Sequence, residues 1–226
     1  MEKNRSSKIL AIIALLIAVA SLTVGFATFS SVLRITPSAT VKTDPDQFSV
    51  VFADTVDDVN KTHTENNVTP TLYGEAATLF TATEATIDNS DLQEPKLENL
   101  SAVFTKPGQS AEYSLHVVNT GKFKAYLKSI NYGTIGDTNK FITCTAIDPV
   151  NTTESYVNAA CEGITVTVKI GNEEAAIGSK EFANHTLDIE ASETLVVTIK
   201  YNDDAAVADG DFEVEFGNIS LDYRSM

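Results

Sequence analysis

The sequence predicts an all-β protein, an antiparallel β-sandwich of immunoglobulin-like or jelly-roll topology, preceded by one N-terminal hydrophobic helix. Three observations predict this fold. A long uncharged segment lies near the N-terminus, strict alternation of apolar and polar residues recurs after residue 30, and turn residues separate the alternating runs. The composition agrees, because 43% of the 226 residues are hydrophobic and 21% are charged, which is enough to bury a core.

The hydrophobic segment covers Ile9–Phe29 and contains no charged residue. A helix needs about 20 apolar residues to cross a bilayer. The basic residues Lys3, Arg5 and Lys8 precede the segment. This arrangement keeps the N-terminus in the cytoplasm and exports the remainder of the chain. Residues 1–29 are therefore expected to form an export segment, and residues 30–226 an extracytoplasmic β-sandwich domain.

Two fates of the export segment stay open. Small residues two positions before Ala20 and Ala27 make both alanines candidate cleavage sites for a signal peptidase. The apolar run is longer than the core of a usual signal peptide, which favours an uncleaved anchor. The expected location is extracellular or at the cell surface in either case, with attachment to the membrane if the segment is retained.

The strand prediction rests on runs in which every second residue is apolar. Because successive side chains of a strand point to opposite faces, such runs indicate strands with one face in a core and one in water. The expected core residues are Phe48, Val50, Phe52, Tyr113, Leu115, Val117, Ile164, Val166, Val168, Leu195, Val197, Ile199, Phe212, Val214, Phe216, Ile219 and Leu221.

Turn signals separate these runs. They are Lys106-Pro107-Gly108, Asn119-Thr120-Gly121, Asn131-Tyr132-Gly133, Gly171-Asn172 and Asp209-Gly210-Asp211. Two polar stretches are expected to be loops, and a short helix is an alternative for the first: Asp54–Asn67 and Asn151–Ala160.

The two cysteines of the chain, Cys144 and Cys161, are close enough in sequence to close a short loop. In an exported protein such a pair is expected to form a disulfide. The spacing is not that of a CxxC metal or redox motif.

The net charge of −15 disfavours nucleic-acid partners, because these require a basic surface. Acidity of this kind keeps an extracellular protein soluble. Calcium binding is a weaker alternative, since calcium takes oxygen ligands from acidic loops. The candidate ligands are Asp203, Asp204, Asp209 and Asp211, although their spacing is not that of an EF-hand.

Catalytic motifs are missing from the sequence, which contains no HExxH, nucleophile elbow or phosphate-binding loop. Its three histidines, His63, His116 and His185, are scattered and are expected at the surface. We therefore expect no enzyme and no cofactor apart from the possible calcium ion.

Two strings carry a family resemblance. The first is Gly25-Phe26-Ala27-Thr28-Phe29-Ser30-Ser31, at the end of the export segment. The second runs from Phe104 to Tyr113, with Pro107-Gly108 as a turn, and continues through Val117-Val118-Asn119-Thr120-Gly121, where Asn119 and Gly121 are expected to reverse the chain in left-handed conformations. Both resemble the TasA/camelysin family of biofilm-matrix fibre proteins, and many bacterial surface β-sandwich proteins carry a unit similar to the second string. The chain departs from the family in its cysteine pair and in the stretch Asp137–Ala160.

The resemblance implies a Gram-positive-type exporter, cleavage by a signal peptidase, and filaments in which the N-terminal strand of one subunit inserts into the next. The matching assembly strand is Thr28–Ile35, with Phe29, Val32, Leu33 and Ile35 as its apolar residues. An edge strand of the same domain, or a tether leaving the membrane, is the alternative for this stretch.

Two functions are consistent with these expectations. The first is an extracellular structural protein, a subunit or accessory component of a surface layer, fibre or biofilm matrix, which associates with itself or with other surface proteins. The second is a membrane-anchored adhesin or ligand-binding module that uses the loops of the sandwich.

Overall fold

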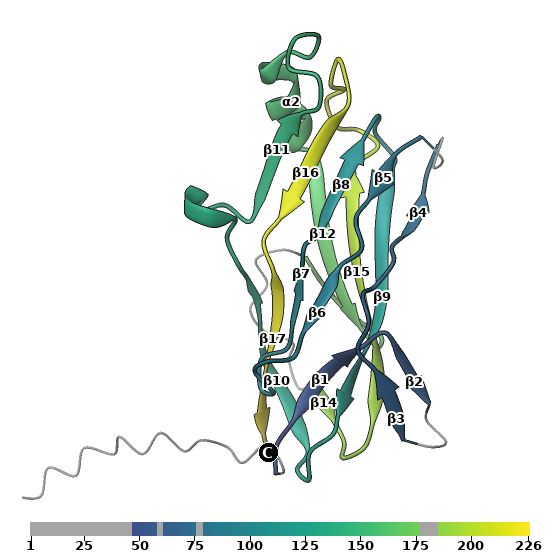
Figure 1. Ribbon diagram of the computed structural model, residues 1–226, viewed down its shortest axis with the longest axis vertical. Helices are drawn as coiled ribbons and strands as arrows, with labels where there is room; N and C mark the ends of the chain where they lie inside the picture. Colours follow the sequence, from purple (N-terminus) through teal and green to yellow (C-terminus); the bar gives the residue numbers. More distant parts are fainter. Residues whose placement is uncertain (1–46, 58–60, 76–78, 177–184) are drawn as a thin grey trace, which may run out of the picture. The chain divides into compact units, whose positions relative to one another are not determined.

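The computed structural model describes residues 47–57, 61–75, 79–176 and 185–226, which belong to one compact unit, Thr43–Met226. The predicted N-terminal helix, both cleavage sites and the proposed assembly strand lie outside the described residues. Within them the chain forms mostly antiparallel β-sheets, arranged in the two layers expected of a β-sandwich (Figure 1).

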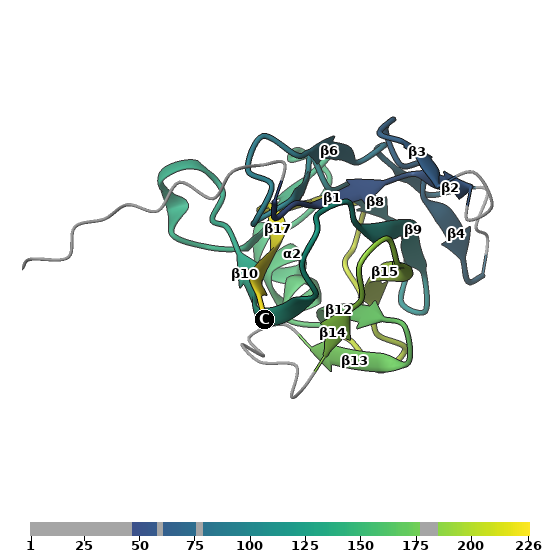
Figure 2. The ribbon, with the colours of Figure 1, turned by 90° about the horizontal axis from the view of Figure 1, so that it is seen from below.

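The first layer is one antiparallel sheet. Its strands follow the order β1 (Val50–Ala53), β9 (Ser110–Asn119), β15 (Ser192–Tyr201), β12 (Ile164–Ile170) and β13 (Glu173–Ala176). Strand β4 (Thr71–Tyr73) also pairs with β9, further along the edge that β1 occupies. Seen from below, the layer curves from β1 to β13, with β10 and β17 lying across from it (Figure 2).

The second layer is formed by two short sheets. One has the order β14 (Thr186–Leu187), β10 (Ala125–Tyr132), β17 (Ile219–Ser225), β7 (Lys96–Glu98) and β6 (Thr86–Asp88). The other has the order β11 (Ile142–Ala146), β16 (Phe212–Phe216), β8 (Ser101–Phe104) and β5 (Thr81–Ala82). The chain passes from one sheet to the other between β5 and β6, β7 and β8, β10 and β11, and β16 and β17, so the two sheets continue each other (Figure 1).

A glycine contact marks the break between these two sheets. A Cβ atom on Gly217, between β16 and β17, would lie 2.0 Å from the carbonyl oxygen of Gly133, which follows β10. The amide of Gly217 donates to Phe141 O at 2.8 Å, and the amide of Gly133 donates to Asn218 O at 2.8 Å. The backbones can approach this closely only because neither residue has a side chain.

The core lies between the layers, and all 17 residues predicted for it are buried. Aromatic side chains fill its upper part, where the ring of Phe104 lies 5.7 Å from Phe80, 6.0 Å from Tyr201 and 6.4 Å from Phe212, measured between ring centroids. Strand β1 departs from simple alternation because both its faces are buried. Val51 and Ala53 pack on the outer side with Val118, against Val56 and Leu92.

Two polar stretches are not the loops that the sequence predicts. Residues 54–67 contain a hairpin of β2 (Thr55–Asp57) and β3 (Thr62–Thr64), and residues 151–160 contain most of helix α2 (Glu154–Cys161). The hairpin has exposed threonines that carry no apolar alternation, and the eight-residue helix is too short to show a period. A short 3-10 turn, η1 (Gly136–Thr138), lies between β10 and β11.

The chain reversal after β9 also differs from expectation. Neither Asn119 nor Gly121 has a positive φ. Asn119 ends β9, and its buried side-chain amide donates to Phe123 O at 2.8 Å and Leu187 O at 3.2 Å. Glycine at position 121 allows the chain to pass close to the backbone of Ser49, because a Cβ there would lie 2.7 Å from the amide nitrogen of Ser49. In the described part of the chain, no helix has the length and apolar character that a membrane span requires.

Candidate functional site

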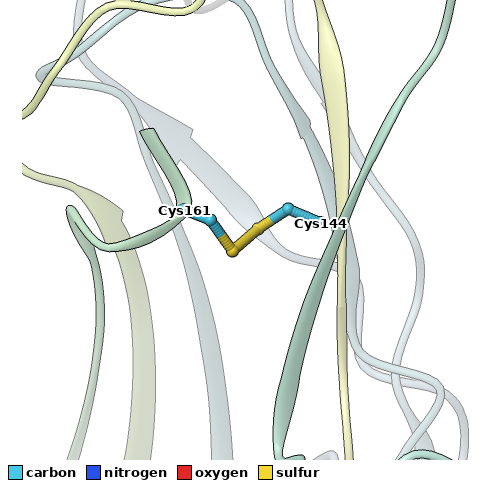
Figure 3. Close-up of a disulfide and its surroundings, with 2 residues drawn as sticks. All are labelled: Cys144 and Cys161. Atoms are coloured by element: carbon cyan, nitrogen blue, oxygen red, sulfur yellow. A yellow bond between two sulfur atoms is a disulfide. The ribbon is translucent and has the colours of Figure 1, made fainter. Parts of the chain in front are cut away.

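A disulfide ties α2 to the second layer. The sulfur atoms of Cys144, in β11, and Cys161, the last residue of α2, are bonded, and their Cα atoms lie 6.0 Å apart (Figure 3). The predicted disulfide is therefore confirmed. A helix of eight residues has little stability of its own, so the bond and the burial of Val157 and Ala160 hold α2 in place.

The upper end of the domain in Figure 1 is a cap made of α2 and two loops, residues 147–153 and 202–211. The Thr153 amide donates to the Asp209 carboxylate at 2.9 Å, and the Ile147 amide donates to Asp211 O at 3.1 Å. At the other end of the helix, a Cβ on Gly163 would lie 2.2 Å from that of Ala205. We call residues 147–163 and 202–211 the upper cap.

The four candidate calcium ligands all lie in the second loop of this cap, but protein groups already engage two of them. The Lys200 ammonium lies 2.6 Å from the Asp203 carboxylate and lowers its pKa, and the hydrogen bonds from Thr153 lower the pKa of Asp209. Asp204 and Asp211 are exposed. Among the described residues, no three acidic, histidine or cysteine side chains are close enough together to hold a metal ion.

A cavity of about 310 Å³ opens at the other end, between the β2–β3 hairpin and the ends of β9 and β15. Its apolar lining comes from Val56 and Val118, and its polar lining from Lys61, Thr62, His63, Asn119, Thr120, Glu190 and Ser192. Lys61 and Glu190 adopt the left-handed conformation, with φ of 54° and 57°, which is uncommon for residues with side chains. A lining that combines apolar and polar side chains suits a small ligand that carries both kinds of group.

His185 is buried, contrary to the prediction that it lies in a surface turn. Its Nε2 atom lies 3.0 Å from a carboxylate oxygen of Glu193, and its Nδ1 atom lies 3.8 Å from one of Glu173. The Tyr223 hydroxyl is buried nearby, and burial together with the negative charge of Glu193 raises its pKa. The other two histidines, His63 and His116, are half-buried.

Large exposed apolar side chains gather at the two ends of the domain. In the described residues there are ten such side chains. Six belong to elements and loops that Figure 1 draws at the upper end: Tyr73 at the end of β4, Leu79 before β5, Ile147 and Val150 between β11 and α2, Tyr156 in α2, and Val207 between β15 and β16. Four belong to segments at or near the lower end: Phe123 between β9 and β10, Tyr126 in β10, Ile189 between β14 and β15, and Met226 after β17.

Sequence reasoning missed both the cavity and the two apolar ends. The cavity takes residues from three segments more than 50 positions apart, so no local pattern marks it. Most of the exposed apolar residues sit in loops, and the others are Tyr73 in β4, Tyr126 in β10 and Tyr156 in α2; a single sequence cannot distinguish such residues from core residues.

Comparisons with protein-family models, with curated proteins and with solved structures found no match. The likeness to the TasA/camelysin proteins thus rests on the two sequence strings alone. The second string covers the turn from β8 to β9, strand β9 itself, and the turn after it.

Proposed function

We propose that this protein is an extracellular structural protein, a subunit or accessory component of a bacterial surface layer, fibre or biofilm matrix. The observation that carries the proposal is the gathering of exposed apolar side chains at the two ends of the domain. Large apolar side chains that are exposed in the same region are a feature of sites of protein association. A protein that has such surface at both ends can bind one neighbour at each.

Two features support the extracytoplasmic location. The Ile9–Phe29 segment with its basic flank suits an export signal or anchor. The disulfide between Cys144 and Cys161 suits an oxidising compartment, because reduced thiols prevail in the cytoplasm. No catalytic activity is part of the proposal.

The resemblance adds a route of assembly to this proposal. Strand Thr28–Ile35 of one subunit would pair with a sheet edge of the next, with Phe29, Val32, Leu33 and Ile35 supplying its apolar contacts. A strand added to a sheet gains backbone hydrogen bonds as well as side-chain burial. Self-association and binding to other surface proteins are therefore the expected interactions, with membrane attachment if the export segment is retained.

The test is an intact-mass measurement of the native protein, made separately on the membrane and culture-fluid fractions, followed by sedimentation of each fraction. We expect a chain that begins after Ala20 or Ala27, in particles much larger than one subunit. Monomers in both fractions, at high concentration and across pH and salt, would refute the structural role.

The cavity at the lower end favours a second function, a membrane-anchored module that binds a ligand. Its volume of about 310 Å³ is at the small end of the range of ligand sites. The test is retention of the full-length protein, in detergent, on a panel of immobilised polysaccharides, with Thr120→Trp as the variant that fills the cavity. Retention that Thr120→Trp abolishes supports this function, and equal retention of both proteins excludes the cavity as the site.

A further inference from the structure

The upper cap presents apolar side chains that protrude from a strongly acidic surface. Val150 is 89% exposed at the tip of the first loop, Val207 is 63% exposed in the second, and Tyr156 is 55% exposed on α2. Residues 147–163 and 202–211 include seven acidic residues and no basic one: Asp148, Glu154, Glu162, Asp203, Asp204, Asp209 and Asp211. The disulfide fixes α2 to β11, and the bond from the Thr153 amide to Asp209 joins the two segments, so the cap surface is held in one arrangement that a partner can recognise.

The lower end is also apolar, but its charge is different. Phe123 is 46% exposed, Ile189 is 51% exposed and Met226 is 69% exposed. The segments that bear them are joined, since the Met226 amide donates to Lys124 O at 2.9 Å and the Lys124 ammonium lies 2.8 Å from Asp188. We call residues 120–126, 188–190 and 224–226 the lower end.

Basic residues are concentrated at this lower end. Lys122, Lys124 and Arg224 all belong to it, with Asp188 and Glu190 as its acidic residues. Lys124 is paired with Asp188 at 2.8 Å and Arg224 with Asp222 at 2.9 Å, so these two cations are already neutralised. Lys122 is exposed and makes no ion pair with any described residue. Lys122 thus gives the lower end a cation that can meet the acidic cap, and both ends expose apolar side chains.

We propose that copies of this chain stack end to end, with the upper cap of one copy seated on the lower end of the next. Apolar side chains of the cap meet those of the lower end, and Lys122 faces the acidic cap. The proposal rests on the structural role proposed above and names the surfaces through which the subunits meet. It does not require the N-terminal strand.

The geometry decides what kind of assembly results. The two surfaces differ and lie at opposite ends of the domain (Figure 1), so each copy uses one surface for each neighbour. Contacts of this head-to-tail kind do not pair off into closed dimers, and they extend into open rows when the rotation between copies does not close a ring. Contact between two caps is disfavoured, because the seven acidic residues of one cap would face the seven of the other.

The experiment is thiol cross-linking of the full-length chain displayed on a Gram-positive host. Both native cysteines are bonded to each other, so introduced cysteines report without background. The variants are Val150→Cys in the cap, Phe123→Cys at the lower end, and the double variant, treated with a short bismaleimide. Ser114→Cys, exposed in the middle of β9, combined with Val150→Cys, is the matched control.

The double variant should give a ladder of regularly spaced bands, the single variants only monomers, and co-expression of the two single variants only monomers and dimers. Strong dimers from Val150→Cys alone, or an equal ladder from the Ser114 control, would overturn the proposal. A third outcome would also overturn end-to-end stacking: the double variant gives no ladder, although an amine cross-linker still links wild-type copies. In that case the structural role proposed above survives. A wild-type chain that no cross-linker joins refutes both.

A second measurement does not depend on cross-linking chemistry. Val150→Glu and Phe123→Glu each place a carboxylate in the proposed contact, and Ser114→Glu adds the same charge on the side of the domain. We expect the first two to raise the concentration needed for assembly at least tenfold, and the third to leave it unchanged. Equal effects of all three variants would contradict end-to-end stacking.

Discussion

Removal of the disulfide tests how the upper cap is held. The double variant Cys144→Ala/Cys161→Ala opens a loop between cysteines 17 positions apart. In the chain-entropy description, closing a loop of this size stabilises the folded state by about 3 kcal/mol, because the bond restricts the unfolded chain. For a domain of this size, 1 kcal/mol corresponds to about 2–4 °C in the melting temperature. The melting temperature should therefore fall by about 6–12 °C.

The loss of stability in the double variant should also be concentrated in the upper cap. Without the bond, α2 is held by the burial of Val157 and Ala160 and by loop contacts at its two ends, from Thr153 to Asp209 and from Asn202 to Gly163. Eight residues form a marginal helix, so α2 should open well before the sheets unfold. Its amide protons should exchange much faster in the double variant, whereas those of β9 and β15 change only with global stability.

The assay is thermal unfolding by circular dichroism together with hydrogen exchange followed by mass spectrometry. A melting temperature lowered by less than about 2 °C would mean that the bond adds almost nothing. An unchanged exchange rate in α2 would mean that packing alone holds the helix. Either result would refute the account of a cap fixed by its disulfide.

Three further predictions concern the sandwich itself. Phe104→Ala removes the ring at the centre of the upper aromatic group and should lower the free energy of unfolding by about 3–5 kcal/mol in urea titrations. Gly217→Ala places a Cβ 2.0 Å from the carbonyl oxygen of Gly133, so the backbones must separate; a melting temperature within 2 °C of wild type would contradict this close approach. Burial raises the pKa of Tyr113 and of Tyr132 from 10 to about 12. Because the folded state holds these protons more tightly than the unfolded state, the two tyrosines stabilise the fold fully below pH 10, and this contribution is lost as the pH rises through about 12. In a pH titration, tyrosinate absorbance should therefore rise together with unfolding.

Much of the fold could be predicted because alternation is a local signal. The run Ile164–Ile170 reveals both the strand and its buried face, and β12 has every second residue buried. The predicted turns Lys106-Pro107-Gly108 and Gly171-Asn172 lie where β8 meets β9 and β12 meets β13, and the glycines have φ of 87° and 54°. These features depend on neighbouring residues only.

Strand partners and buried polar groups could not be predicted in the same way. Leu115 pairs with Leu195, 80 positions away, and nothing in either run specifies the other. His185 follows no apolar pattern, and it is buried because Glu193 of β15 and Glu173 of β13 are brought to it by the sheet. The apolar ends and the cavity arise from loops that meet only in the folded chain, so the structure is needed to find them.

The central claim is that this protein assembles with copies of itself outside the cell. The most direct measurement is electron microscopy, with antibody labelling, of the native protein on its own cells, combined with sedimentation of the released material. The account predicts labelled rows or fibres and particles of many subunits, which shorten when Val150 and Phe123 are both changed to glutamate. Scattered single labels and a monomer at every concentration would contradict it.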